Sequence, residues 1–211
     1  MTLLDPEKLH TKNAIEISKI VQSAGSSGIM IGGSTSTSVY HLDNMVKAVK
    51  KSVGIPVILF PNDVTGISQY ADAVFFMSLM NSSNPYYITG AQALGAPLVK
   101  RYGLEAIALG YLIVGESISA ASFIGQARPI PYEKPELAAI YALAAQYLGM
   151  HFVYLEAGSG AEKPVPPEMI RSVKRMIEIP VIVGGGIRSP KSAISAVKAG
   201  ADIIVTGTLI E

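Results

Sequence analysis

Short runs of aliphatic and β-branched residues alternate along this chain with segments of helical pattern, and this alternation constrains its fold more than any other feature. Apolar runs separated by helices are typical of parallel strands that are covered on both faces. We count eight such runs, at residues 2–4, 28–31, 56–60, 73–77, 106–114, 152–156, 181–183 and 202–205. Eight consecutive βα units predict an α/β fold of the (β/α)₈ TIM barrel type.

Segments with apolar residues at three- and four-residue spacing lie between these runs, at residues 12–24, 39–53, 85–101, 135–148, 167–177 and 190–199. The interval 61–72 is too short for a crossover helix with two loops, so we predict that the third helix of the barrel is missing. The sequence ends soon after the eighth run, so the closing C-terminal helix is expected to be absent from it. No linker or obvious repeat is visible, and we expect residues 1–211 to form a single domain.

The composition excludes several classes of protein. Hydrophobic residues make up 49% of the chain and charged residues 16%, so the chain can bury a large core and is not intrinsically disordered. The net charge is +1, and no basic cluster is interleaved with aromatic residues, so we expect no nucleic-acid partner. The absence of cysteine excludes disulfides, thiolate metal sites and a cysteine nucleophile, and it favours the cytoplasm.

The chain is nevertheless apolar for a free monomer, with a mean hydropathy of +0.38. This excess leaves room for a buried subunit interface or for a groove that binds an apolar substrate. No stretch reaches the roughly 18 apolar residues that a membrane-spanning helix needs, so we predict a soluble protein.

Three glycine-rich loops follow the last three predicted strands, at residues 158–160, 184–186 and 206–208. In a parallel barrel the loops after the strands form the active face, and phosphate commonly binds after strands seven and eight. Glycine lets backbone N–H groups approach an anion closely, and the following helix directs its positive dipole end to the same point. Turn geometry alone would explain one such loop, but three consecutive loops predict a phosphate-binding cup.

Glu156 ends the sixth predicted strand, and the alternation of side chains places it on the same side as Tyr154. A carboxylate at the mouth of the barrel, beside loop 158–160, is well placed to accept a proton from a substrate hydroxyl. Glu156 is therefore the candidate catalytic residue. The alternative is a structural ion pair with a neighbouring lysine or arginine.

Asp5 and Ser34 follow two adjacent predicted strands. A carboxylate and a hydroxyl at neighbouring strand ends can share one hard cation, so this pair is a candidate Mg²⁺ site. Each residue also has a local alternative, because Asp5 could cap a turn and Ser34 lies in a stretch that could cap the next helix. Asp63, in the shortened third connection, could equally cap a turn and has no assigned role.

Six motifs occur in the order found in one known family, and they are TLLDP at residues 2–6, IGGS at 31–34, GYLIV at 110–114, YLEAGSG at 154–160, VGGGIR at 183–188 and TGT at 206–208. On these motifs the chain resembles the geranylgeranylglyceryl phosphate synthase family, in the branch typical of many archaea. The resemblance covers essentially the whole chain, and its most specific part is the segment 154–160.

The resemblance implies a Mg²⁺-dependent prenyltransferase that joins geranylgeranyl diphosphate to the 3-hydroxyl of sn-glycerol 1-phosphate and releases pyrophosphate. This is the first ether-forming step of archaeal membrane lipids. By resemblance, Asp5 and Ser34 hold the Mg²⁺, and Glu156 orients or deprotonates the attacking hydroxyl. The residues implied to contact glycerol phosphate are Tyr154, Leu155, Glu156, Ala157, Gly158, Ser159, Gly160, Gly184, Gly185, Gly207 and Thr208. The family's barrel also lacks its third helix, in agreement with the short interval 61–72.

Three alternatives stay open. The first is a relative that uses a longer heptaprenyl donor, and the second is another phosphate-binding barrel enzyme, which the lack of lysine at the strand ends disfavours. The third is a binding protein that uses the apolar surface of residues 137–148. The candidates for a prenyl groove, each of which could instead be core, are Tyr86, Tyr87, Tyr111, Ala120, Ala121 and Phe123. Besides the two substrates, we expect further copies of this chain as partners, and the assignment allows a transient contact with a membrane surface.

Overall fold

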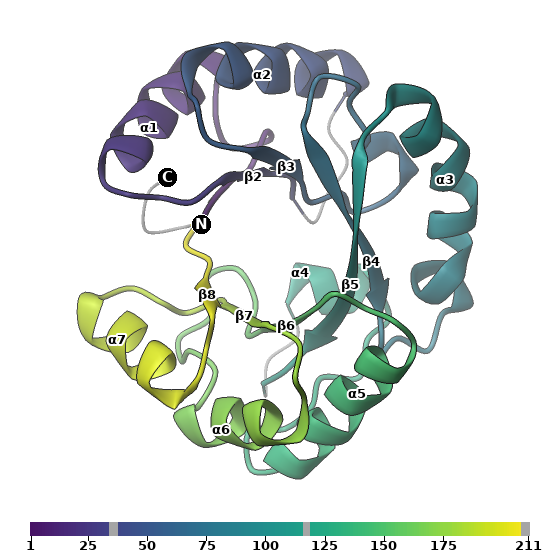
Figure 1. The fold of residues 1–211 in the computed structure, drawn as a ribbon, viewed down its shortest axis with the longest axis vertical. Helices are drawn as coiled ribbons and strands as arrows, with labels where there is room; N and C mark the ends of the chain where they lie inside the picture. The colour runs from purple at the N-terminus through teal and green to yellow at the C-terminus, as the bar shows by residue number, and fades with distance from the viewer. Residues whose placement is uncertain (34–37, 116–118, 208–211) are drawn as a thin grey trace. The chain divides into compact units, whose positions relative to one another are not determined.

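Eight strands form one sheet in sequence order in the computed structural model, which describes residues 1–33, 38–115 and 119–207 (Figure 1). The strands are β1 (Thr2–Leu4), β2 (Ile29–Ile31), β3 (Val57–Leu59), β4 (Ala73–Leu79), β5 (Glu105–Ile113), β6 (Phe152–Glu156), β7 (Val181–Gly184) and β8 (Ile203–Ile204). The α-helices are α1 (Thr11–Ser23), α2 (Val39–Ser52), α3 (Ala91–Tyr102), α4 (Ala120–Ile124), α5 (Pro135–Tyr147), α6 (Pro167–Met176) and α7 (Pro190–Ala199). Strands β1 to β4 pair in parallel, and so do β5 to β8. The fold is of the predicted (β/α)₈ class.

The connection between β3 and β4 contains no α-helix, as predicted. Residues 60–72, all of which the structure describes, hold only the 3₁₀ helix η1 (Val64–Gly66). Asp63 caps this turn, because its Oδ1 accepts hydrogen bonds from the N–H and the O–H of Thr65 at 2.7 and 2.6 Å. The third helix of a regular barrel is therefore replaced by a capped turn.

Two short elements differ from the sequence-based expectation. The predicted helix 85–101 consists of a π-helical turn, η2 (Tyr86–Gly90), followed by α3. Helix α4 was not predicted, because its five residues are too few to show a helical period. The side chain of Ser119 caps α4 by accepting a hydrogen bond from the N–H of Ser122 at 3.1 Å.

Small residues allow α5 to pack closely on the strands that carry the predicted site. The buried face of α5 consists of Ala138, Ala139, Ala142 and Ala145. In β5, a Cβ at Gly110 would lie 2.6 Å from the Cβ of Ala145, so only glycine allows this approach. The same core contains the outward side chains of Val153 and Leu155 in β6. This packing holds β6, at whose end Glu156 lies.

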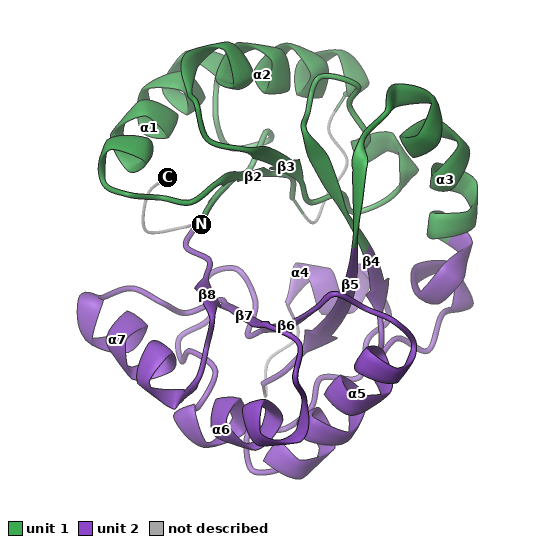
Figure 2. Ribbon diagram, viewed as in Figure 1, with its two compact units in different colours: residues 1–76, 91–107, 210–211 green, residues 77–90, 108–209 purple. Residues whose placement is uncertain are grey.

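The chain divides into two compact units, which Figure 2 shows in different colours. Unit 1 comprises residues 1–76, 91–107 and 210–211, and unit 2 comprises residues 77–90 and 108–209. A hydrophobic core in unit 1 joins β1 to β3 with α1 and α2, and one in unit 2 joins β6 and β7 with α5 and α6. That residues 1–211 form a single domain stays a prediction.

The two units contain the same hydrogen-bonded contact, which the sequence analysis did not detect. In unit 1, Gln22 at the end of α1 accepts a hydrogen bond from the N–H of Gly54, before β3, at 2.6 Å. In unit 2, Gln146 at the end of α5 accepts one from the N–H of Glu178, before β7, at 2.7 Å. The partners are 32 residues apart in both cases. Equivalent helices are thus joined to equivalent turns.

A second shared contact joins the starts of neighbouring strands. Asp72, before β4, accepts a hydrogen bond from the N–H of Val57 at 2.8 Å and pairs with a lysine of α2. Asp202, before β8, accepts one from the N–H of Val181 at 2.8 Å and pairs with a lysine of α6. These contacts indicate that the two units repeat one arrangement of strands and helices. They fix the N-terminal ends of the strands, so the loops at the opposite ends are available for a site.

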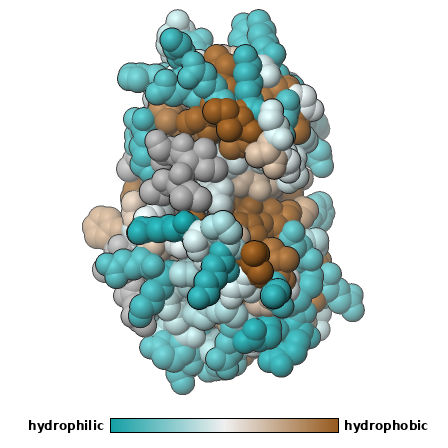
Figure 3. Space-filling model, turned by 90° about the vertical axis from the view of Figure 1, so that its left-hand side faces the viewer, coloured by the Kyte–Doolittle hydropathy of each residue, from teal (hydrophilic) through white to brown (hydrophobic). Residues whose placement is uncertain are grey.

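Several helices expose apolar side chains to solvent. Ile20 on α1 is 68% exposed, and Ile194 and Val197 on α7 are 54% and 56% exposed. Figure 3 shows one face of the molecule, on which hydrophobic residues gather among hydrophilic ones. Within the described residues, no helix combines the length and the apolar character needed to cross a membrane.

Candidate active site

The C-terminal end of β6 presents two polar side chains on one face of the sheet. Val153, Leu155 and Ala157 belong to the core that β6 shares with α5 and α6. Because side chains alternate along a strand, Tyr154 and Glu156 lie on the opposite face. The predicted pairing of these two residues on one side is therefore confirmed. It also follows that Leu155 and Ala157 can contact a ligand only through their backbone.

The carboxylate of Glu156 is buried and hydrogen-bonded, and the residue is only 7% exposed. Its Oε1 accepts a hydrogen bond from the N–H of Gly158 at 2.6 Å, and the carboxylate also accepts one from the phenol of Tyr154. Burial raises the pKa of the Glu156 carboxyl above its usual value, while these two hydrogen bonds act to lower it. The alternative of a structural ion pair is not seen, because no lysine or arginine is paired with Glu156 among the ion pairs of the described residues. A buried carboxylate with a raised pKa is suited to accept a proton.

Tyr154 owes its position to the absence of a side chain at Gly184. A Cβ at Gly184 would lie 2.1 Å from the phenol oxygen of Tyr154, so any other residue would displace the ring. Tyr111, beside Tyr154 in the sheet, packs edge-on against it with ring centroids 5.3 Å apart. Burial raises the pKa of Tyr154 well above its usual value, and the neighbouring Glu156 adds to this effect. The phenol therefore stays protonated and donates to the carboxylate.

Gly185 brings the loop after β7 against Glu156. It has a φ of +81°, and a Cβ there would lie 2.6 Å from Oε1 of Glu156 and 2.7 Å from the nitrogen of Gly158. In the sheet, Glu156 pairs with Gly184, so the two loops leave neighbouring strands side by side. The candidate catalytic carboxylate and two of the predicted phosphate loops thus meet in unit 2.

The loop after β6 turns on two glycines in the left-handed region, Gly158 with φ +106° and Gly160 with φ +76°. Ser159 lies between them. Further along, the backbone at Lys163 packs against Gly186, where a Cβ would lie 2.8 Å from the carbonyl oxygen of Lys163. The loop therefore packs directly on the loop after β7.

The third predicted phosphate loop follows β8. The N–H of Val205 donates to the carbonyl of Val183 at 2.9 Å, which keeps the chain beside β7 as it leaves the sheet. Gly207 is the last residue that the structure describes, and Thr208 lies outside the described residues. The contribution of this loop stays a prediction.

Asp5 lies in unit 1, after β1. Its Oδ1 accepts a hydrogen bond from the N–H of Glu7 at 3.0 Å, and its Oδ2 lies 3.5 Å from the ammonium nitrogen of Lys8. It therefore caps a turn, one of the two roles expected for it. A Cβ at Gly33 would lie 2.6 Å from Oδ1 of Asp5, so the lack of a side chain there leaves room at the carboxylate.

The predicted partner of Asp5, Ser34, lies outside the described residues. No group of three or more histidine, aspartate or glutamate side chains that could hold a metal occurs in the parts of the chain that are described. The oxygen of Asp5 and the space beside it fit a hard cation held by few protein ligands, as Mg²⁺ commonly is. Magnesium at Asp5 and Ser34 stays a prediction.

The sequence model of the PcrB family matches residues 1–211. This chain belongs to the PcrB family. The chain is also similar in sequence to proteins named as enzymes. It is 58% identical over 211 residues to the geranylgeranylglyceryl phosphate synthase of Pyrococcus abyssi, covering 99% of this chain and 82% of that protein. It is 59% identical to the enzyme of the same name from Thermococcus kodakarensis, with the same coverage.

A solved structure agrees closely with this one. The (S)-3-O-geranylgeranylglyceryl phosphate synthase of Thermoplasma acidophilum, crystallised with its substrate sn-glycerol 1-phosphate, superposes with a TM-score of 0.96 at 41% sequence identity. The match covers 100% of this chain and 85% of that one. The resemblance drawn from the sequence motifs is thereby confirmed.

The sequence did not predict two residues that contact the candidate site of this PcrB protein. Tyr111 was considered only as a residue of a prenyl groove, but it is 7% exposed and packs on Tyr154. Arg188 was noted only as part of a motif, yet its guanidinium reaches the loop after β6. The contact of Tyr111 with Tyr154 follows from the register of β5 and β6. It could be predicted only by knowing that these two strands are neighbours. Arg188 gave no signal beyond its place after three glycines.

Proposed function

We propose that this chain is a prenyltransferase that forms an ether bond between geranylgeranyl diphosphate and the 3-hydroxyl of sn-glycerol 1-phosphate. The observation that supports this best is the buried Glu156 carboxylate in contact with Gly158 and Gly185, the glycines of two adjacent loops. One small polar acceptor, with a phosphate at one end and a hydroxyl at the other, matches such a site. The family relatives described above carry the corresponding name.

The loops bind the acceptor through its phosphate, and Glu156 acts on its hydroxyl. Backbone N–H groups of the glycine-rich loops hold the phosphate without an intervening side chain. The carboxylate of Glu156 accepts the proton of the 3-hydroxyl, and the oxygen attacks the first carbon of the prenyl group. The bond from that carbon to the diphosphate breaks, and pyrophosphate leaves. Tyr154 and Gly158 hold the carboxylate in one orientation throughout.

Asp5 and Ser34 are the residues that would hold the divalent cation. A bound Mg²⁺ neutralises the negative charge that develops on a diphosphate leaving group. The turn at Asp5, fixed by the N–H of Glu7, orients the carboxylate for this purpose. We also propose that the protein acts in the cytoplasm as a homo-oligomer, for which exposed apolar residues such as Ile140 and Tyr147 of α5 offer a contact.

The proposed function predicts a strict choice of acceptor. We expect product from geranylgeranyl diphosphate with sn-glycerol 1-phosphate and at least about tenfold lower kcat/KM with sn-glycerol 3-phosphate, because Glu156 and the phosphate loops define two fixed points on the acceptor. The measurement is ether product by mass spectrometry, with prenyl donors of increasing length. A best donor of C35 would instead indicate the heptaprenyl reaction, and no product with any donor would contradict the proposed function.

The proposed metal site predicts that Mg²⁺ chelation stops turnover and that added Mg²⁺ restores it. Asp5→Asn removes the anionic ligand but keeps an oxygen that can cap the turn, so we expect about 10- to 100-fold more Mg²⁺ to be needed for half-maximal rate. Asp63→Asn is the matched control, since Asp63 also caps a turn after a strand. Equal Mg²⁺ dependence in both variants would remove Asp5 from the site.

A further inference from the structure

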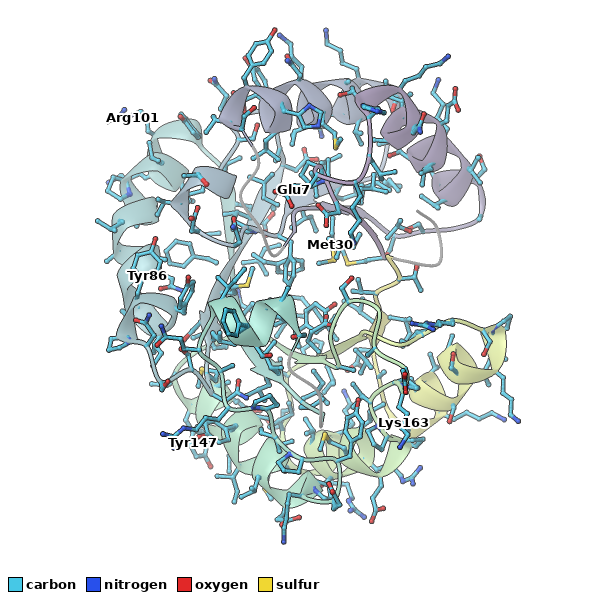
Figure 4. The ribbon with its side chains drawn as sticks, turned by 180° about the vertical axis from the view of Figure 1, so that it is seen from behind. Glu7, Met30, Tyr86, Arg101, Tyr147 and Lys163 are labelled. Atoms are coloured by element: carbon cyan, nitrogen blue, oxygen red, sulfur yellow. The ribbon has the colours of Figure 1, made fainter. Side chains whose placement is uncertain are left out.

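The loop between β6 and α6 is held at several points, and most of these lie away from its apex. Gly158 is fixed by Glu156, and the carbonyl of Lys163 accepts a hydrogen bond from the phenol of Tyr132 at 3.0 Å. Lys163, labelled in Figure 4, also packs against Gly186. The chain is therefore tied to the rest of unit 2 before the loop apex, at Gly158, and after it, at Lys163.

The apex has a different anchor. Nothing lies within 4 Å of the position that a Cβ of Gly160 would occupy, so packing on that side does not hold the residue. The carbonyl oxygen of Gly160 instead accepts a hydrogen bond from Nη2 of Arg188 at 2.7 Å. Arg188 lies in the connection from β7 to α7, directly before the N-cap Ser189. One guanidinium thus links the loops after β6 and β7.

Two hydrogen bonds orient the Gly160–Ala161 peptide group. Its carbonyl accepts from the solvent-exposed Arg188, and its N–H donates to the carbonyl of Gly158 at 3.1 Å. No Cβ at Gly160 restricts rotation of this peptide, so its orientation depends on these two hydrogen bonds. If the carbonyl of Gly160 turned toward a bound phosphate, its negative end would repel the anion. A hydrogen bond to a charged donor is roughly twice as strong as one between neutral groups, and it keeps the carbonyl directed toward Arg188. The guanidinium also brings a positive charge to the edge of the proposed cup.

We propose that Arg188 is a positioning residue for acceptor binding, which holds the Gly158–Gly160 loop in its anion-binding form and attracts the phosphate dianion. This inference rests on the proposed function, because it assigns a residue to the same acceptor site. Arg188 acts on the phosphate end of the acceptor, whereas Glu156 acts on the hydroxyl end. Loss of Arg188 therefore affects affinity for the acceptor more than the chemical step.

The test compares Arg188→Gln with Arg188→Lys and with the control Arg175→Gln. Arg175 lies in the last turn of α6, which leads into the start of β7 and not into its loop end. Calorimetry with sn-glycerol 1-phosphate, without prenyl donor, gives Kd, and steady-state kinetics give kcat and both KM values. Inorganic phosphate as a competitor distinguishes recognition of the phosphate from recognition of glycerol.

For Arg188→Gln we expect Kd and KM for the acceptor to rise about 10- to 100-fold, as for the loss of a hydrogen bond to a charged group. The inhibition constant of inorganic phosphate should rise in parallel, while kcat and the KM for the prenyl donor change less than about threefold. Arg188→Lys should recover part of the affinity, because it restores the charge but not the planar fork. Arg175→Gln should match the wild type.

Three results would overturn the inference. The first is an unchanged acceptor Kd in Arg188→Gln. The second is a fall in kcat of this variant with no change in its acceptor KM. The third is an equal loss of acceptor affinity in Arg188→Gln and Arg188→Lys, together with an altered thermal unfolding midpoint. The last pattern would mean that Arg188 only stabilises the fold. A wild-type protein that binds no glycerol phosphate would instead contradict the proposed function, so the two failures are distinguishable.

Discussion

Replacement of Glu156 by glutamine is expected to lower kcat by about 10²- to 10⁴-fold, the range typical for loss of a general base. Glutamine has nearly the same shape, and its amide oxygen can still accept the hydrogen bond from Gly158 that Glu156 accepts at 2.6 Å. It cannot take the proton of the attacking hydroxyl. Because the phosphate loops stay in place, the Kd for sn-glycerol 1-phosphate should change by less than about tenfold. Rapid-quench measurement of a single turnover separates the chemical step from product release.

We also expect Glu156→Gln to change how the stability of the protein depends on pH. Burial raises the folded-state pKa of Glu156 above its unfolded value, so the folded protein binds more protons in the window between these two values. The stability contributed by the protonated form is complete below the unfolded pKa and is lost as pH rises through the folded pKa. Glu156→Gln removes this loss. Its free energy of unfolding relative to the wild type should therefore increase from pH 4 to pH 8, measured by urea denaturation.

Activity and stability of Glu156→Gln together test the role of the carboxylate. An inactive variant that is more stable than the wild type at pH 8 shows that Glu156 serves the reaction at a cost to stability. If Glu156→Gln instead kept kcat within about threefold of the wild type, the carboxylate would not be the base. A less stable variant at pH 8 would show that the two hydrogen bonds to Glu156 outweigh its burial.

Replacement of Gly185 by alanine is expected to lower kcat/KM by at least about 100-fold, because it displaces both ends of the acceptor site. The new Cβ would lie 2.6 Å from Oε1 of Glu156, and 2.7 and 2.8 Å from the backbone nitrogen and oxygen of Gly158. Two of these atoms belong to the backbone, and Oε1 of Glu156 is buried and held by the hydrogen bond from Gly158, so the two loops must move apart. A shift of about 1 Å near the reacting groups is enough for such a loss. Kinetics with both substrates measure the effect.

Gly149 provides a matched control for Gly185. Its φ is +83°, close to the +81° of Gly185, but nothing lies within 4 Å of its Cβ position. Gly149→Ala therefore introduces the left-handed strain of an alanine, about 1–2 kcal/mol, without the clash. We expect a lower unfolding midpoint with unchanged kcat/KM. Equal activity losses in the two variants would show that backbone strain, and not the contact with Glu156, causes the effect.

Much of the fold follows from local patterns. The eight predicted strands match the observed strands to within about two residues, since each is a short apolar run bounded by turn residues. The missing third helix was predictable from chain length alone, because residues 61–72 cannot contain a crossover helix. Helix α4 could not be predicted, since a five-residue helix shows no period. The repeated contacts of Gln22 and Gln146 were also not visible, because each joins residues 32 positions apart.

The candidate site was only partly predictable. Glu156 and the glycine loops were recognised because strand ends and glycines are local signals. The sequence did not show why each glycine is needed. Gly184 leaves space for the ring of Tyr154, and Gly185 leaves space for the carboxylate of Glu156. Such contacts join different strands, and their distances depend on register.

The residue order thus established the strands, the helices, the place of the loops and the candidate base, because periodicity and glycine content act over a few neighbouring residues. The packed molecule decided the environment that turns Glu156 into a base, with its burial, its hydrogen bonds from Tyr154 and Gly158, and its contact with Gly185. It also brought Arg188 to Gly160. The physical reason is that solvation, hydrogen bonding and steric exclusion depend on distances between chain segments, which arise only when the strands and helices pack.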